Sequence, residues 1–235
     1  MSKAVIPSVV PIAVLGSGRG SNFDAIQRAI TDGRLSARIV AVVSDREHAP
    51  ILDKARAAGI PALHVAPINT PPAPGAPPLP ARRVRETHDQ NVLQAVEPYA
   101  PRFLVMAGYF RVVTPVLIEA FRDSQGYSRI VNVHPSLLPA FPGLDAYAQA
   151  YHYGAQCSGV TVHLVEEDVD TGPICAQETF SLAGCVDAAA VEQRGLAVEH
   201  RLFPQALHWI VNQKFGVETR VLPRTGLRRL CVRPD

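Results

Sequence analysis

Short apolar runs alternate along this chain with longer segments whose apolar residues recur every three or four positions. The short runs predict buried strands, and the periodic segments predict helices that cover them. The predicted strands are residues 9–15, 37–44, 60–65, 103–107 and 130–134. The predicted helices follow a glycine-rich turn at residues 16–22, lie at residues 50–59, 82–96 and 144–154, and include a short segment that begins at Pro115. This alternation predicts a parallel sheet with right-handed crossovers.

The last third of the chain follows a different pattern. Residues 160–165 and 173–180 predict two strands joined by an acidic turn, which we expect to be antiparallel at the edge of the sheet. Residues 188–212 predict one long helix, and residues 214–222 and 227–232 predict a terminal hairpin or tail. The chain therefore predicts an α/β fold: a mostly parallel, doubly wound, Rossmann-like sheet flanked by helices, with an antiparallel edge and a long C-terminal helix.

The glycine-rich turn at residues 16–22 leads from the first predicted strand directly into a helix. Ser21 with Asp24 predicts a capping box at the start of that helix. Such an arrangement binds phosphate, because free N–H groups and the helix dipole face the anion. Neither the glycine pattern of dinucleotide-binding loops nor that of nucleoside triphosphate-binding loops is present, so a phosphate monoester is favoured. The alternative is a plain glycine turn between strand and helix.

Two polar residues interrupt the strand at residues 130–134. Asn132 and His134 are two positions apart, so both side chains point to the same face, and Pro135 prevents the strand from continuing. Open α/β sheets place their chemistry at such carboxyl ends of strands. The alternative is a pair that only ties down a loop.

Asp170 follows another predicted strand, and a carboxylate near His134 favours its protonated form. Protonated His134 and the Asn132 amide could then donate hydrogen bonds to a developing oxyanion. No nucleophilic serine or cysteine is implied, so we expect the attacking group to come from the substrate.

Composition narrows the function classes further. The chain has 235 residues, of which 47% are hydrophobic and 19% charged, with a net charge of +2, as expected for one soluble domain. No basic or aromatic-interleaved patch indicates nucleic acid, and no apolar run is long enough to span a membrane. The four cysteines lack C-x-x-C spacing, which predicts free thiols in a cytoplasmic protein and no zinc site. Residues 67–80 contain seven prolines and predict an extended surface loop.

Three segments resemble a known family. The stretch SGRGSN (residues 17–22) is similar to a phosphate loop, and NVHPSLLPAFPGL (132–144) and SGVTVHLVEEDVDTGP (158–173) are similar to the two motifs of folate-dependent formyl transfer. Together they resemble the phosphoribosylglycinamide formyltransferases of purine biosynthesis, over residues 11–212. The resemblance implies a single domain over residues 1–235. It also implies a phosphate-binding half at residues 1–104 and a folate-binding and catalytic half at residues 105–235.

The same resemblance implies a reaction. The amine of 5-phosphoribosylglycinamide attacks the formyl carbon of the co-substrate N10-formyltetrahydrofolate, without a metal. Asn132, His134 and Asp170 stabilise the tetrahedral intermediate, and Asp170 raises the pKa of His134. The residues implied to bind phosphoribosylglycinamide are Gly20, Ser21, Asn22, Leu196, Ala197, Val198 and Glu199. The residues implied to bind folate are Arg85, Phe110, Arg111, Val112, Val113, Asn132, Glu166, Glu167, Asp168, Val169 and Asp170. The expected partners are small-molecule substrates, and the expected state is a monomer or a homodimer.

The chain departs from the family at a few positions. Arg19 stands where the family often has Asn, and Asp145 and Tyr147 stand where bacterial relatives have His. His163 matches a family histidine near the site, but a satisfied buried histidine is an equal alternative, so it is left out of the catalytic set. Other interpretations of the resemblance stay open. The chain could be a 10-formyltetrahydrofolate hydrolase, a sugar-amine formyltransferase, or a non-catalytic protein that binds folate or a phosphosugar.

Overall fold

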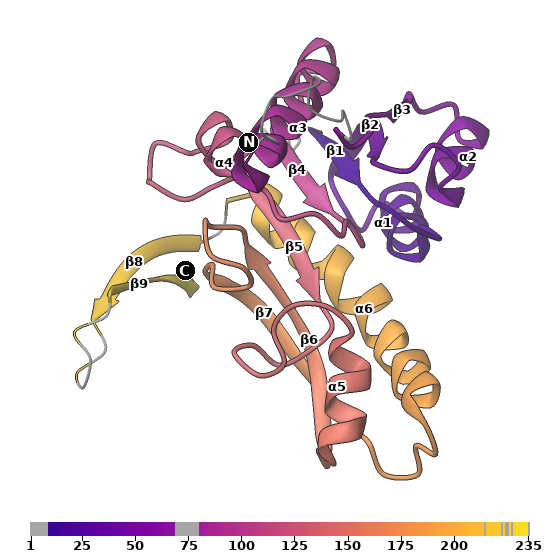
Figure 1. The fold of residues 1–235 in the computed structure, drawn as a ribbon, viewed down its shortest axis with the longest axis vertical. Coiled ribbons are helices and arrows are strands. Elements are labelled where there is room, and N and C mark those ends of the chain that lie inside the picture. Colours follow the sequence, from indigo (N-terminus) through magenta and orange to yellow (C-terminus); the bar gives the residue numbers. More distant parts are fainter. Residues whose placement is uncertain are drawn as a thin grey trace, which may run out of the picture.

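A seven-stranded sheet forms the centre of the structure, a computed structural model that describes residues 9–68, 80–213, 215–221, 223, 226 and 228–234 (Figure 1). From one edge to the other the strands are β3 (Ala62–His64), β2 (Ala37–Ser44), β1 (Val10–Leu15), β4 (Phe103–Met106), β5 (Ile130–His134), β6 (Cys157–Leu164) and β7 (Ile174–Ser181). The strands from β3 to β5 are parallel, and β6 is antiparallel to both β5 and β7. The predicted mostly parallel sheet with an antiparallel edge is confirmed.

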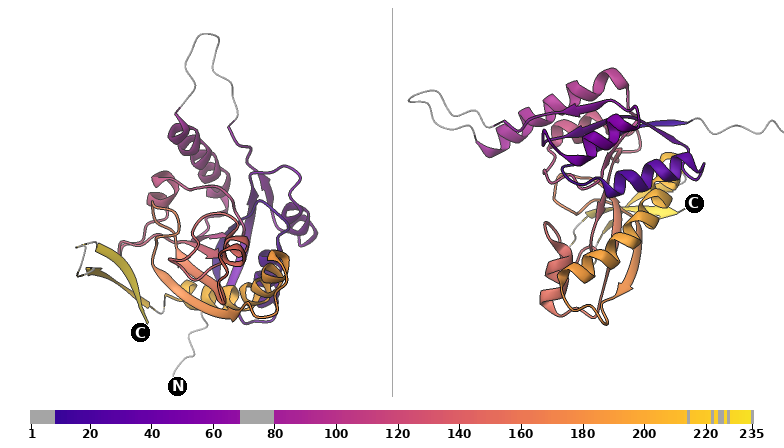
Figure 2. Two further views of the ribbon diagram at one scale, coloured as in Figure 1. Left: turned by 60° about the horizontal axis from the view of Figure 1, so that its bottom comes forward. Right: turned by 90° about the vertical axis from the view of Figure 1, so that its right-hand side faces the viewer.

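Helices cover both faces of this sheet (Figures 1 and 2). They are α1 (Ser21–Thr31), α2 (Pro50–Ala57), α3 (Ala81–Val96), α4 (Pro115–Ala120), α5 (Ala146–Tyr153) and the long α6 (Ala188–Val211), with a 3-10 turn η1 (Glu97–Tyr99) after α3. On one face α1, α2 and α6 pack through fully buried residues such as Ile26, Ile51 and Phe203. On the other face α3 and α4 pack through the buried Val92 and Leu117. The predicted flanking helices and the long C-terminal helix are therefore present.

The start of α1 differs from the prediction. Gly20, not Ser21, is the N-cap, and no side chain caps the helix. Gly20 has φ of 75°, a conformation that favours glycine, and a Cβ there would lie 2.9 Å from the side chain of Ile51. Asp24 pairs with Lys54 of α2 instead of completing a capping box. The predicted box is therefore wrong, because the turn places Ser21 inside the helix.

Strand β6 begins at Cys157, three residues before the predicted start. The apolar pattern hides these residues, because Ser158 and Gly159 interrupt it. Gly159 lies so close to β7 that a Cβ would be 2.3 Å from the carbonyl oxygen of Glu178. The strand therefore depends at this point on the close approach of two backbones, which hydrophobic periodicity does not record.

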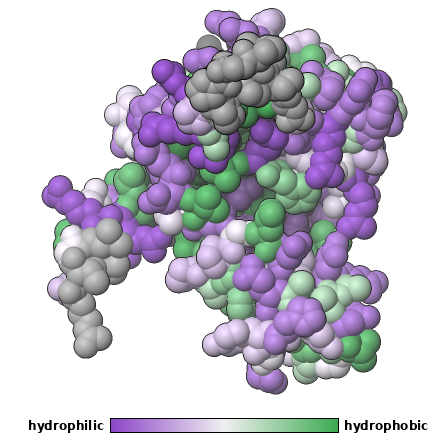
Figure 3. Space-filling view, viewed as in Figure 1, coloured by the Kyte–Doolittle hydropathy of each residue, from purple (hydrophilic) through white to green (hydrophobic). Residues whose placement is uncertain are grey.

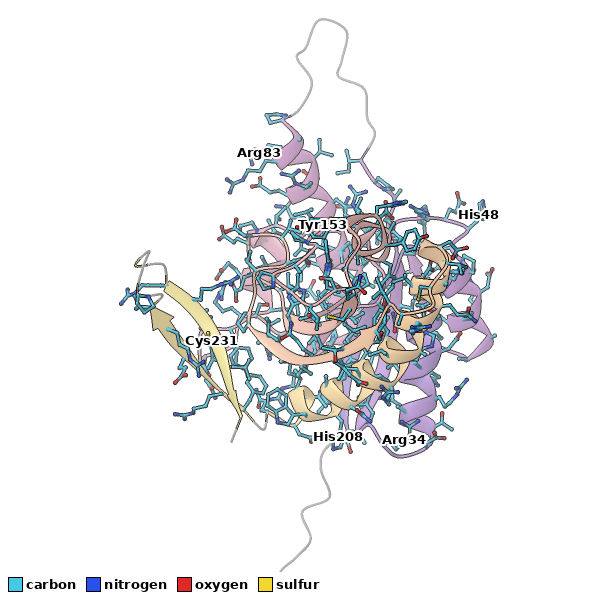
Figure 4. All side chains as sticks on the ribbon, turned by 90° about the horizontal axis from the view of Figure 1, so that it is seen from below. Arg34, His48, Arg83, Tyr153, His208 and Cys231 are labelled. Carbon is cyan, nitrogen blue, oxygen red and sulfur yellow. The ribbon has the colours of Figure 1, made fainter. Side chains whose placement is uncertain are left out.

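The terminal hairpin consists of β8 (Phe215–Val221) and β9 (Arg228–Pro234), which pair with each other and extend from the body of the molecule (Figures 1 and 4). Phe215 anchors it: its ring centroid lies 5.1 Å from that of Tyr127 and 5.0 Å from that of Trp209. The predicted hairpin is confirmed. Most of the predicted proline-rich loop, residues 69–79, lies outside the described residues. Among the helices that are described, none has the length and apolar character needed to cross a membrane.

Candidate active site

A cavity lies at the carboxyl ends of β1, β4 and β5. The strand order reverses between β1 and β4, because the chain runs from β1 outward to β2 and β3 and then returns to the other side of β1. Connections that leave in opposite directions open a crevice at such a point. Here it is a cavity of about 590 Å³. Its lining comes from residues 18–22, 106–113, 132–135, 143–148, 163 and 165–170, and from Ala188, Ala189, Glu192, Leu196 and Glu199 of α6.

His134, at the end of β5, contacts a carboxylate and a main-chain carbonyl. Its Nδ1 lies 3.3 Å from Oδ2 of Asp170, and its Nε2 lies 2.8 Å from the carbonyl oxygen of Phe141. The backbone N–H of Gly143 donates to the same oxygen of Asp170 at 2.8 Å. Asp170 belongs to the turn after β6, and Phe141 and Gly143 belong to the loop after β5. The structure thus brings together His134 and Asp170, which the sequence separates by a complete strand.

Burial and charge act in opposite directions on this pair. The pKa of His134 lies below its ordinary value of 6.5, because burial disfavours the imidazolium more than the Phe141 carbonyl and the Asp170 carboxylate favour it. Burial also raises the pKa of Asp170, but His163, the Gly143 N–H and His134 together outweigh it and hold that pKa below its ordinary value. Asp170 therefore acts on His134 in the expected direction, but burial opposes it and lowers the pKa of His134, where the sequence led us to expect a raised one.

Asn132 lines the cavity and is held by His163 of the neighbouring strand β6. Nδ2 of Asn132 lies 3.1 Å from Nε2 of His163, and Nδ1 of His163 lies 2.8 Å from the carbonyl oxygen of Leu164. If Nδ1 donates to that carbonyl, Nε2 accepts from the Asn132 amide. An amide has two N–H donors, so the second one is available to an oxygen atom in the cavity. Nε2 of His163 also lies 3.6 Å from Asp170, which makes His163 part of the same cluster.

The start of α1 forms another part of the lining. The first N–H groups of a helix have no partner within it, and here Ser21 and Asn22 carry two of them into the cavity wall. Arg19, just before the helix, forms an exposed ion pair of 2.7 Å with Glu192 of α6. The region therefore offers a helix N-terminus and a nearby cation, which together suit an anion.

Glu199 of α6 supplies a buried carboxylate, only 6% exposed. Nδ2 of Asn22 donates to its Oε2 at 2.6 Å, and the hydroxyl of Tyr147 donates to its Oε1 at 2.6 Å. No Lys, Arg or His within the described part of the chain forms an ion pair with it. Oδ1 of Asn22 is buried beside it, also with no partner among the described residues. This corner of the cavity therefore presents acceptors and suits a ligand group that donates hydrogen bonds or carries positive charge.

Apolar side chains line the mouth of the cavity. Nine large apolar side chains are exposed among the described residues. Four of them belong to the cavity lining: Phe110, Val112, Leu144 and Val169. Figure 3 shows apolar surface across the hollowed middle of this face of the molecule. Exposed apolar residues concentrated at a cavity indicate a ligand with apolar or aromatic surface.

Most of the residues singled out in the sequence lie in this lining: Gly20, Ser21, Asn22, Phe110, Arg111, Val112, Val113, Asn132, His134, Glu166, Glu167, Asp168, Val169, Asp170, Leu196 and Glu199. Three others do not. Ala197 is exposed on α6 and Val198 packs in the core, because successive helix positions point in different directions. Arg85 is exposed on α3 and lies outside the lining. The first turns of α3, where Figure 4 labels Arg83, lie toward the edge of the molecule.

The predicted set lacked several residues of the site, among them His163, Tyr147 and Glu192. His163 faces Asn132 across the β5–β6 pair, so the strand register would have identified it. Tyr147 was noted only as a departure from the family, and Glu192 lies one turn before Leu196 on the cavity side of α6. Tyr147 and Glu192 belong to the site because of tertiary contacts, with Glu199 and Arg19, and a sequence pattern does not reveal such contacts.

Comparison with known proteins identifies the family of this chain. Residues 10–207 match the family described as formyl transferase. The phosphoribosylglycinamide formyltransferase of Bacillus subtilis (strain 168) is 31% identical over 88% of this chain and 96% of that protein, and that of Escherichia coli (strain K12) is 31% identical over 92% and 94%. The crystal structure of glycinamide ribonucleotide transformylase 1 from Symbiobacterium toebii is 34% identical, covers 96% of this chain and 94% of its own, and gives a TM-score of 0.81. This chain is therefore a transferase that belongs to the formyl transferase family, among the phosphoribosylglycinamide formyltransferases.

Proposed function

We propose that this protein transfers the formyl group of N10-formyltetrahydrofolate to the amine of 5-phosphoribosylglycinamide, a step of de novo purine biosynthesis. The observation that carries the proposal is one cavity lined by a helix N-terminus, by the buried Glu199 carboxylate, which has no ion-pair partner among the described residues, and by the cluster of Asn132, His134 and Asp170. A phosphate fits the helix N-terminus, an amine fits the Glu199 carboxylate, and a carbonyl oxygen fits the N–H donors of Asn132 and His134. Formyl transfer to a phosphorylated amine needs all three groups in one place.

The acceptor's amine attacks the formyl carbon directly, and the formyl oxygen becomes an oxyanion. When this tetrahedral intermediate collapses, the bond between the formyl carbon and N10 breaks, and the proton that the amine loses goes to N10 of the released tetrahydrofolate. The free N–H of the Asn132 amide donates to that oxygen, and the Nε2–H of His134 leaves the Phe141 carbonyl and donates to it as well. Burial lowers the pKa of His134 and so opposes its protonation in the free protein. Negative charge on the oxyanion then favours the imidazolium, and Asp170 stabilises it from the other side of the ring.

Folate fits the apolar mouth of the cavity. The loop of residues 110–113 and the turn of residues 166–170 face it, and their exposed apolar side chains offer contact area to a flat aromatic ring. The phosphorylated acceptor fits the side of Ser21, Asn22 and Glu199. We therefore propose that residues 1–104 contribute the phosphate site, and that residues 105–235 contribute the folate site and the catalytic cluster.

The test is release of tetrahydrofolate from N10-formyltetrahydrofolate by the purified protein, with and without 5-phosphoribosylglycinamide. We expect release only with the acceptor and one formylated acceptor per folate released. Release that ignores the acceptor would indicate a hydrolase. Folate binding without release would indicate a different acceptor or a binding protein, and either result would overturn the proposal.

A further inference from the structure

A tyrosine of α5 reaches the buried carboxylate of α6. Tyr147 is 8% exposed, and its hydroxyl donates a hydrogen bond of 2.6 Å to Glu199. Its ring packs near Phe180 of β7, with centroids 6.2 Å apart, and belongs to a small apolar cluster with Leu182 and Val191. The ring is thus fixed by packing on several sides, and its hydroxyl has one defined partner inside the cavity.

The helix that carries Glu199 leaves room for this ring at one residue. A Cβ on Gly195 would lie 2.2–2.3 Å from the Cζ, Cε1 and hydroxyl atoms of Tyr147, a distance that real Cβ atoms do not show. Glycine inside a helix is destabilising relative to alanine, and the close approach of the Tyr147 ring explains why a glycine stands in the middle of α6. Glu199 follows Gly195 by four positions and therefore lies on the same side of the helix. Gly195 admits the ring, and Glu199 receives its hydroxyl.

The hydroxyl remains a donor over the working range of pH. Burial and the negative charge of Glu199 raise the pKa of Tyr147 well above its ordinary value of 10.0, so the phenol does not ionise. Together with the Asn22 amide it fixes both oxygens of the carboxylate while no cation of the described residues neutralises them. An oxygen held by one hydrogen bond still has lone pairs for a second donor.

We propose that Tyr147 is a positioning residue for the acceptor: its hydroxyl, admitted by Gly195, holds the Glu199 carboxylate in the orientation that receives the acceptor's amine. The inference rests on the proposed function and goes beyond it, because it assigns acceptor binding to a contact between α5 and α6. Tyr147 does not touch the reacting atoms. Its loss therefore weakens acceptor binding and leaves both folate binding and the fold in place.

The experiment compares Tyr147→Phe with Tyr151→Phe in the purified full-length protein. Tyr151 is the matched control, because it lies one turn later on α5 and its hydroxyl donates to the Val186 carbonyl outside the cavity. A hydrogen bond to a charged group is worth enough that we expect the KM for phosphoribosylglycinamide to rise about tenfold to hundredfold in Tyr147→Phe. The KM for formyltetrahydrofolate and the kcat should change little, and the melting temperature should fall only by what one buried hydrogen bond contributes. Tyr151→Phe should match the wild type in all four.

A second variant tests the contact with α6. Gly195→Ala should displace the ring and raise the KM for the acceptor in the same way, and the double variant with Tyr147→Phe should be no worse than the stronger single variant. The inference is overturned if the acceptor KM of Tyr147→Phe is unchanged, if both KM values rise together, or if the two changes multiply. A wild-type protein without acceptor-dependent transfer would instead overturn the proposed function, and this inference with it.

Discussion

The cavity has two walls that are built differently. The strand-end wall holds Asn132 and His134 at fixed positions on one strand, with His163 opposite them on the next. The helical wall holds Tyr147 and Glu199, which meet only because α5 packs on α6. On the first wall the backbone ladder sets the spacing, and on the second wall side-chain packing sets it.

This difference matches the different roles that we propose for the two walls, catalysis and acceptor binding. The strand-end wall holds the side chains that we assign to the reacting carbonyl, and the helical wall holds the carboxylate that we assign to the acceptor's amine. Changes on the strand-end wall should therefore lower kcat, and changes on the helical wall should raise the KM for the acceptor. The predictions below test that contrast, starting with the largest effect.

His134→Ala should have the largest effect, because it removes an N–H donor for the formyl oxygen. We expect kcat to fall by about 10²- to 10⁴-fold while formyltetrahydrofolate still binds. The measurement is steady-state transfer together with a fluorescence titration of folate. His48→Ala is the control, since His48 is exposed at the edge of the molecule (Figure 4) and should retain activity. Turnover of His134→Ala close to that of the wild type would show that the donor has been misassigned.

Ser21→Asp tests the N-terminus of α1, which lines the same cavity. A carboxylate there stabilises α1 but repels a phosphate, so the KM for the phosphorylated acceptor should rise roughly tenfold to hundredfold with kcat little changed. Ser21→Asn has the same size without the charge and should behave nearly as the wild type. Equal KM values in the two variants would place the phosphate elsewhere.

The contrast between the walls also explains what the sequence could and could not predict. Asn132, His134 and the glycine turn lie at strand ends, and strand ends follow from apolar runs and a period of two. Asp170 also follows a predicted strand, and the structure places it beside His134. Periodicity is a local property, so whatever depends on the end of a strand was visible.

The residues of the helical wall could not be predicted from periodicity. The sequence pattern around Gly195 does not show that the Tyr147 ring of another helix occupies the space beside it. Ser21 and Asp24 have the spacing of a capping box, but in the structure the Asp24 carboxylate pairs with Lys54. The depth at which His134 is buried was equally hidden, and it reverses the sign of the expected pKa shift. Each of these failures comes from a tertiary contact or from burial.

Asp170→Asn sharpens the electrostatic part of the comparison. Asp170 has φ of 56°, which asparagine tolerates, so the variant should keep the backbone and lose only the charge. Because the carboxylate favours the imidazolium, its removal should lower the pKa of His134 further below 6.5. An NMR titration of the imidazole C–H signals would measure this shift.

The sign for stability follows from the same pKa shift. The unfolded chain takes up a proton at His134 near pH 6.5, before the folded protein does, so the free energy of unfolding should fall as pH drops through that window. In Asp170→Asn the folded-state pKa of His134 is lower, so the pH range over which the free energy of unfolding falls should extend to lower pH. An unchanged or raised His134 pKa in the variant would contradict the assigned contact.

The smallest effect should come from Glu192→Gln, on the outer part of the helical wall. The Arg19–Glu192 pair is exposed, with 76% and 45% of the two side chains accessible, so its loss should leave the melting temperature nearly unchanged. Release of Arg19 from its partner adds free positive charge beside the start of α1. The KM for the acceptor should therefore fall by about twofold, and high salt should remove the difference. Arg19→Gln should raise the KM instead. If both variants shift the KM in the same direction, the pair acts by joining α1 to α6, and the helical wall orders the phosphate site as well as the carboxylate.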